Sequence, residues 1–138
     1  MYPGADIPVV QLSLDTTQSA SFHYDIAKRL APLRDEGVLI LGSGDIVHNL
    51  RLYDFRDPAP IGWALEFNET IKDLIKARDH QPLIAYETLL PHTRLAIPTR
   101  EHYLPLLTVL ALQRDDEPLR FFNDRVQSAI SMTSLQIG

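Results

Sequence analysis

Two short apolar segments, separated by a segment with helical periodicity, set the strongest limit on how this chain can fold. Residues Ile7–Leu14 are rich in β-branched and aliphatic side chains, and Val38–Leu41 form an apolar run bounded by glycines, so both are predicted to be buried strands. Between them, apolar side chains recur at helical spacing and predict a helix from Ser21 to near Gly37: Phe22, Ile26, Leu30 and Leu33. A strand, a helix and a strand in succession indicate a βαβ unit.

The rest of the chain predicts further helices and a closing strand. Thr99 is predicted to cap a helix that Pro105 keeps short, and the alternating residues 129–137 predict a strand. An amphipathic helix is predicted after the proline-bearing loop 54–60, with four side chains on its buried side: Trp63, Phe67, Leu74 and Ile75. The fold class expected is α/β, with one domain over residues 1–138 and a three-layer-like sheet flanked by helices.

Composition excludes several classes of function. The net charge is −5, and the basic residues are scattered among acidic ones, so a nucleic-acid partner is not expected. No apolar run is long enough to span a membrane, and the N-terminus has no basic region followed by a long apolar run, so a cytoplasmic location is expected. Because cysteine is absent, a bound metal must be held by His, Asp or Glu.

The first candidate site follows the second apolar run. Gly42-Ser43-Gly44 places a small, flexible backbone beyond the end of a predicted strand, where open α/β sheets usually bind ligands, and His48 follows four residues later. A dinucleotide-binding loop is disfavoured because Val47 occupies the position of the third glycine of that motif. The alternative is that the glycines form a tight turn and His48 is a polar loop residue.

The second candidate is the pair Glu101 and His102. Adjacent helical residues point about 100 degrees apart, so we expect one of the two to bind a metal and the other to support it. The alternative is a glutamate that complements a helix dipole beside a surface histidine. The remaining histidines, His23, His80 and His92, are interpreted as structural or solvated.

Several stretches of the sequence resemble a known enzyme family. Five stretches, which follow one another in order along essentially the whole chain, closely resemble the class III extradiol dioxygenases of the 4,5-DOPA branch: Met1–Leu14, Leu33–Ile40, Gly42–Leu50, Pro98–Leu106 and Ser131–Gly138. The resemblance implies the C-terminal portion of that fold, and an N-terminal half that carries two further histidines is expected to be missing here. It also implies that the enzyme opens a catechol ring with dioxygen.

The resemblance also implies roles for particular residues. The family's metal-binding and catalytic positions fall on His48 and His102, which we expect to converge within a few ångströms. His102 is the better metal ligand of the two, and His48 is a ligand or an acid/base. Glu101, Ser43 and Asn49 are expected to support the site or to contact substrate. Relatives often have His-Pro-Thr where this chain has Ile97-Pro98-Thr99, which removes one imidazole but neither matched position.

The expected cofactor is Fe(II) or Zn(II), and the expected partners are a small aromatic diol and dioxygen. A redox-active metal with open positions suits ring opening, whereas zinc cannot carry the redox step. Two alternatives remain open: a non-catalytic interaction protein with the same fold, and a homo-oligomer or a separate chain that supplies the N-terminal half. The uncovered strands at the start of the chain are expected to promote association.

Overall fold

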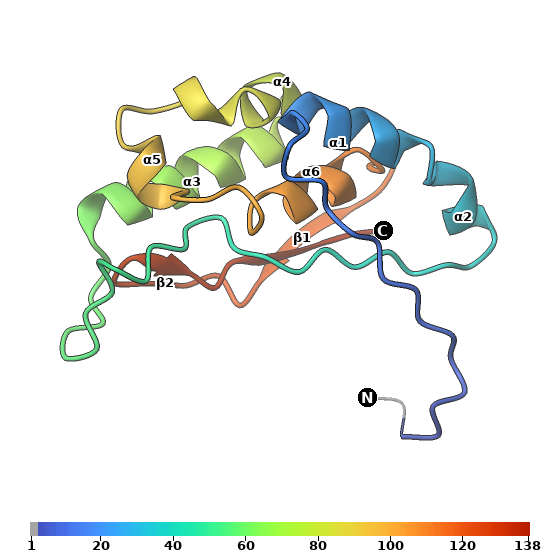
Figure 1. Ribbon diagram of the computed structural model, residues 1–138, viewed down its shortest axis with the longest axis horizontal. Helices are drawn as coiled ribbons and strands as arrows, with labels where there is room; N and C mark the ends of the chain where they lie inside the picture. The colour runs from blue at the N-terminus through green and yellow to red at the C-terminus, as the bar shows by residue number, and fades with distance from the viewer. Residues whose placement is uncertain (1–2) are drawn as a thin grey trace.

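The computed structural model describes residues 3–138, which form a layer of helices packed on a layer of short strands (Figure 1). The helices are α1 (Ala20–Lys28), α2 (Ala31–Asp35), α3 (Gly62–Lys76), α4 (His80–Ile84), the 3-10 helix η1 (Tyr86–Thr88), α5 (Thr93–Ala96) and α6 (Leu104–Leu110). None of the helices in this part of the chain is long and apolar enough to cross a membrane.

The strands form two antiparallel pairs near the C-terminus. They are β1 (Leu119–Phe122), β2 (Val126–Gln127), β3 (Ile130–Ser131) and β4 (Ser134–Ile137). β1 pairs with β4 in a register that places Leu119 opposite Ile137, and β2 pairs with β3. In Figure 1 the helices lie on one side of both pairs.

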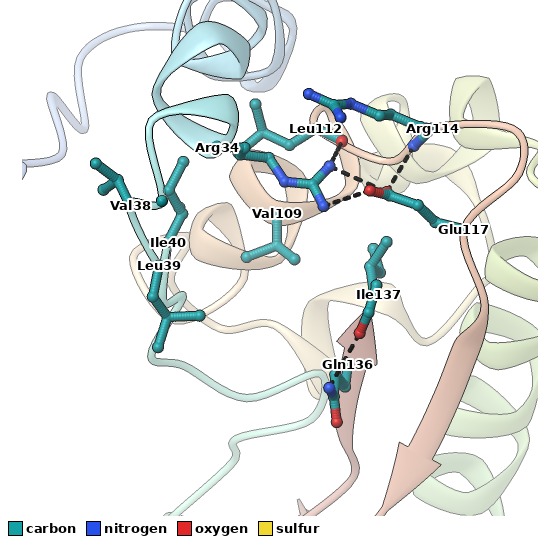
Figure 2. A pocket seen from close by; sticks show the side chains of 12 residues that line it. Arg34, Val38, Leu39, Ile40, Val109, Leu112, Arg114, Glu117, Gln136 and Ile137 are labelled. Atoms are coloured by element: carbon teal, nitrogen blue, oxygen red, sulfur yellow. Dashed lines mark hydrogen bonds and ion pairs between the residues drawn. The ribbon is translucent and has the colours of Figure 1, made fainter.

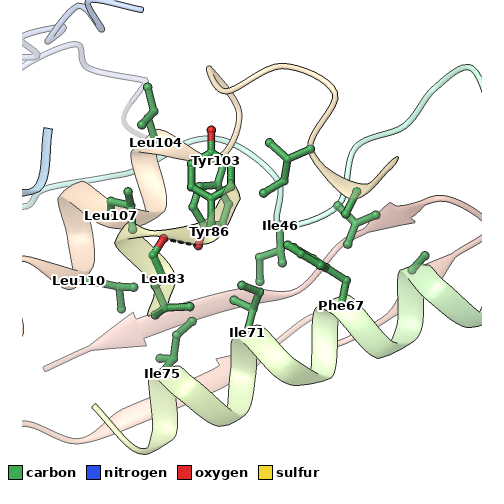
Figure 3. Packing of buried hydrophobic residues seen from close by; sticks show 14 of the residues in the cluster. Ile46, Phe67, Ile71, Ile75, Leu83, Tyr86, Tyr103, Leu104, Leu107 and Leu110 are labelled. Carbon is green, nitrogen blue, oxygen red and sulfur yellow. Dashed lines mark hydrogen bonds between the residues drawn. The ribbon is translucent and has the colours of Figure 1, made fainter. Parts of the chain in front are cut away.

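The core lies between α3, α6 and the strands (Figure 3). In α3, Ala64, Phe67, Ile71 and Ile75 recur three or four residues apart and are completely buried, so they form one apolar stripe along the helix. In Figure 3, Ile75 points toward Leu83 of α4, and Phe67 and Ile71 point toward Ile46. The amphipathic helix predicted after loop 54–60 is therefore confirmed.

The α/β class is confirmed, but the two strands predicted at Ile7–Leu14 and Val38–Leu41 are wrong, and with them the βαβ unit. Figure 1 shows both segments as elongated coil, with the first leading away from the helices. Their side chains are largely exposed, with 92% of Val10 and 80% of Leu41 open to solvent. A strand requires a hydrogen-bonded neighbour, and no strand within residues 3–138 pairs with either segment.

The first helix also differs from its prediction. α1 begins after Ser19, whose hydroxyl oxygen accepts a hydrogen bond from the Phe22 N–H, and it ends at Lys28. Pro32 lies in the first turn of a separate helix, α2, because proline fits that position but not a helix interior. The predicted apolar stripe faces solvent at Phe22 and Ile26.

Two further predictions need correction near the C-terminus. Residues 99–103 form a turn, and α6 begins at Leu104 without a side-chain cap, so Thr99 is not the cap that its position suggested. α6 is nevertheless short, as Pro105 predicted. The tail 129–137 forms two strands, β3 and β4, because Met132 and Thr133 interrupt it.

Candidate functional site

One short buried segment, residues 45–49, connects the predicted site residues. It lies between the loop after α5 and the strand β3, and backbone hydrogen bonds hold it on both sides. They run from Asp45 N to His102 O (2.9 Å), from His48 N to Ala96 O (3.0 Å), from Asn49 N to Ala129 O (3.0 Å) and from Ser131 N to Val47 O (2.9 Å). The segment therefore behaves as an internal strand, and it brings His48 to the turn that carries His102.

The two glycines before this segment allow it to approach α6 closely. A side chain at Gly44 would overlap the carbonyl oxygen of His102, and a Cβ atom at Gly42 would lie 2.7 Å from the carbonyl oxygen of Pro105. Neither glycine has a positive φ. Both are therefore needed for close packing of the backbone rather than for a tight turn.

The imidazole rings of His48 and His102 lie beside each other, with centroids 4.9 Å apart and planes tilted by 50°. The predicted convergence of these two side chains is confirmed. His48 is buried, with 8% of its surface exposed, whereas His102 is exposed. The pair thus combines one imidazole in the protein interior with one that faces outward.

Hydrogen bonding fixes the tautomer of His48. Its Nε2 lies 2.9 Å from the carbonyl oxygen of Thr99, which can only accept a hydrogen bond, so Nε2 carries the proton. The other nitrogen, Nδ1, is buried and has no hydrogen-bond partner within residues 3–138. Burial lowers the pKa of His48, an effect that the nearby His102 reinforces and the Thr99 carbonyl opposes. His48 therefore offers an unprotonated nitrogen that can accept a proton or bind a metal.

Two carboxylates lie near the imidazole pair. Asp45 is partly buried, and burial raises its pKa while the two imidazoles oppose that shift. Glu101 is exposed and accepts a hydrogen bond of 2.7 Å from the Thr99 hydroxyl, which lowers its pKa. Glu101 thus stabilises the loop at Thr99, whose carbonyl oxygen is the hydrogen-bond partner of His48. Sequence reasoning missed Asp45, although its position directly after Gly42-Ser-Gly44 was a usable signal.

The other predicted site residues have different surroundings. The Asn49 side chain donates to the carbonyl oxygen of Leu95 at 2.9 Å and accepts from the Leu52 N–H, so it anchors the turn that follows His48. Ser43 is exposed, and its side chain makes no hydrogen bond within the described chain.

The remaining histidines lie apart from the pair. Nε2 of His23 lies 2.9 Å from the Asp15 carbonyl oxygen, and His80 bridges the Tyr24 hydroxyl and the Gln113 amide. These two histidines connect neighbouring segments.

The residues present fit part of a metal centre. Imidazoles are good ligands for iron and zinc, and the unpartnered Nδ1 of His48 beside the exposed His102 is a suitable donor set. Across residues 3–138, however, no three His, Asp or Glu side chains gather closely enough to hold a metal. A catalytic metal site usually has three protein ligands, and this pair offers two candidate ligands.

Comparison with known proteins identifies the family. A family described as the catalytic LigB subunit of aromatic ring-opening dioxygenase matches residues 1–134. The chain belongs to this family. The resemblance to extradiol dioxygenases of the 4,5-DOPA branch is confirmed by the relatives of this LigB-family chain. This chain, over its full length, is 42% identical to the 4,5-DOPA dioxygenase extradiol of Escherichia coli (strain K12). Over 77% of this chain, it is 39% identical to the 4,5-DOPA dioxygenase extradiol of Beta vulgaris.

A solved structure shares the fold of this LigB-family chain. The crystal structure of the uncharacterized protein JW3007 from Escherichia coli K12 is 41% identical and superposes with a TM-score of 0.91 over the whole chain. The chain covers 58% of that structure. It spans 52% of the Escherichia coli relative and 40% of the Beta vulgaris relative, or about half the length of the curated relatives that it matches.

Proposed function

We propose that this LigB-family chain takes part in the extradiol opening of a catechol ring by dioxygen, and that His48 and His102 are its contribution to the active site. The observation that carries the proposal is the pair of imidazoles, whose ring centroids lie 4.9 Å apart and one of which has a buried nitrogen without a hydrogen-bond partner among residues 3–138. The names of the relatives, 4,5-DOPA dioxygenase extradiol, support a catechol of the DOPA type as substrate.

His102 is the proposed metal ligand, because its exposed ring can be reached by ligands from another segment and by substrate. Ferrous iron is the proposed metal rather than zinc, since the reaction requires a redox-active ion. When bound, the iron would hold both catechol and dioxygen and allow electrons to pass between them.

His48 is the proposed acid/base. Its Nε2 N–H donates a hydrogen bond to the Thr99 carbonyl oxygen. Nδ1 is therefore the ring nitrogen that can take a proton from a catechol hydroxyl and return it later. The lowered pKa of His48 keeps this nitrogen unprotonated at neutral pH, as a base must be. Glu101 acts indirectly, because it accepts a hydrogen bond from the residue whose carbonyl orients His48.

A second candidate is a non-catalytic binding protein with the same fold. The absence of a third ligand within residues 3–138 favours it for the chain taken alone. The two functions differ in whether His102 binds iron.

The test is an anaerobic calorimetric titration of the 138-residue chain with ferrous iron. It is carried out on the wild type and on three variants. We expect weak binding that His102→Ala abolishes and that His48→Ala reduces far less. His80→Gln is the control, because an amide can replace its hydrogen bonds to Tyr24 and Gln113 far from the pair. Iron binding that is unaffected by His102→Ala would contradict the proposal and favour the non-catalytic function.

A further inference from the structure

Ion pairs hold the strand β1 at both of its ends. Before β1, Arg34 of α2 pairs with Glu117 at 2.6 Å beside a cavity (Figure 2). After β1, Lys72 of α3 pairs with Asp124, also at 2.6 Å, and with Glu69 at 3.0 Å. The second cluster differs from the first because hydrogen bonds between side chains continue it into the protein interior.

The interior part of this cluster is a hydrogen bond between Asn68 of α3 and Ser131 of β3. The Ser131 hydroxyl lies 2.6 Å from the Asn68 Oδ1 atom, and both residues are buried. The Asn68 amide nitrogen donates to the Glu69 carboxylate, which can only accept, so the amide oxygen faces Ser131 and the hydroxyl is the donor. Within residues 3–138, this is the one side-chain hydrogen bond between α3 and β3.

Ser131 also reaches the candidate site through its backbone. Its N–H donates to the Val47 carbonyl oxygen at 2.9 Å, and the Asn49 N–H donates to the Ala129 carbonyl oxygen at 3.0 Å. The chain around β3 therefore holds the residues on both sides of His48. β3 itself is short, since two of its residues pair with two residues of β2, so its position depends on contacts beyond that pairing.

We propose that Asn68 and Ser131 are positioning residues for His48. Their hydrogen bond fixes β3 against α3, and β3 fixes the backbone around His48, so that His48 Nε2 stays within hydrogen-bonding distance of the Thr99 carbonyl oxygen. The importance of this contact for ring opening rests on the proposed role of His48 as the base. The positioning itself is tested without catalysis.

Burial explains why the loss of this contact should be felt at His48. Removing either partner leaves the other without its hydrogen bond in the protein interior, which is costly. We expect β3 to shift so that water can reach the unpaired group, and this shift loosens the backbone around His48. A hydrogen bond that only stabilised the fold would lower the free energy of unfolding and leave the His48 ring in place.

The test is NMR of the imidazole nitrogens in the isotope-labelled 138-residue chain at mildly alkaline pH. It reports the tautomer of His48 and the exchange of its N–H proton with water. In the wild type we expect the Nε2–H tautomer alone. Ser131→Ala and Asn68→Leu should each add the Nδ1–H tautomer and speed exchange of the Nε2 proton at least about tenfold. The double variant should change no more than either single variant, because both act through one contact.

Thr133→Val is the matched control. The Thr133 hydroxyl donates to Asp124 at 3.0 Å in the same cluster, so this variant loses a hydrogen bond but keeps the one between Asn68 and Ser131. It should retain the wild-type His48 signals. Ser131→Cys keeps the shape of the side chain with a weaker donor, so it should fold and show a smaller change in the same direction as Ser131→Ala.

Two results would overturn the inference. One is a wild-type His48 spectrum in Ser131→Cys and in each folded variant that lacks the hydrogen bond between Asn68 and Ser131. The other is a change in Thr133→Val as large as that in Ser131→Ala, which would assign the effect to general loosening of the cluster.

Discussion

The ring of His48 packs against the ring of His102 at a centroid distance of 4.9 Å, although α3, α4, η1 and α5 all lie between them in the sequence. The close approach depends on backbone contact. The Asp45 N–H donates to the His102 carbonyl oxygen, and Gly44 leaves no side chain between the two segments. The geometry of the candidate site thus depends on a glycine that makes no contact with a ligand.

Replacing Gly44 with alanine should therefore damage the site. The added methyl group would overlap the His102 carbonyl oxygen, which belongs to the backbone and cannot easily move away. We expect a loss of about 1–3 kcal/mol in the free energy of unfolding, as for other overpacked sites. Urea denaturation measures this loss.

Gly62→Ala is the control for Gly44→Ala. Gly62 is the first residue of α3, and no atom lies within 4 Å of the position that its Cβ would take. We expect this variant to be as stable as the wild type or slightly more stable, because alanine favours the helix. Equal effects of the two substitutions would show that close packing at Gly44 is unimportant.

His48 should make stability depend on pH near neutrality. Its pKa is lowered in the folded state, so between the folded value and the ordinary value of 6.5 the unfolded chain binds more protons. The contribution of His48 to the free energy of unfolding is therefore complete above pH 6.5, and it is lost as the pH falls through the pKa of His48 in the folded state. NMR titration of the imidazole signals measures the pKa directly.

His80 must be separated from this effect, because burial lowers its pKa as well. In a His80→Gln background, the remaining pH dependence just below neutrality should disappear when His48→Gln is added. A His48 signal that titrates at or above the ordinary value would contradict both the buried, unprotonated state and the proposed role as a base.

The Tyr103 hydroxyl should contribute measurably to stability. Tyr103 is completely buried beneath the loop that carries His102, and its hydroxyl donates a hydrogen bond of 3.0 Å to the Leu83 carbonyl oxygen (Figure 3). Tyr103→Phe leaves that carbonyl unpaired and should cost about 1–2 kcal/mol of unfolding free energy in urea denaturation.

Tyr86 offers a matched comparison for Tyr103→Phe. Its ring lies 4.5 Å from that of Tyr103, but its hydroxyl makes no hydrogen bond within the described chain. Tyr86→Phe should therefore be nearly neutral. A cost for Tyr86→Phe as large as that for Tyr103→Phe would assign the effect to ring packing instead of the hydrogen bond.

The sequence predicted those parts of the fold whose stabilising contacts lie within the chain. The α3 helix follows from the periodicity of Phe67 and Ile75, and its stripe is buried against α6 and the strands. Residues 7–14 and 38–41 carry an equally clear strand pattern, but strand formation depends on a neighbour, which residues 3–138 do not provide.

The same contrast applies to the candidate site. The resemblance to known dioxygenases indicated His48 and His102, and the structure brings them together. The hydrogen bond from His48 to the Thr99 carbonyl oxygen, which fixes the tautomer of His48, could not be predicted. Every residue has a backbone carbonyl group, so the sequence does not show which one His48 contacts. Asp45 was missed although it directly follows Gly42-Ser43-Gly44, because the sequence alone does not show that the two imidazoles lie beside it.

Oxygen uptake tests the central claim most directly. The tagged chain, co-expressed with the unmatched part of the Escherichia coli relative and loaded anaerobically with ferrous iron, would be mixed with DOPA in an oxygen electrode. We predict oxygen consumption that His102→Ala abolishes together with iron binding, and that His48→Ala abolishes while iron is retained. Oxygen consumption at the wild-type rate in His48→Ala, or none in a wild-type complex that holds iron, would contradict the account.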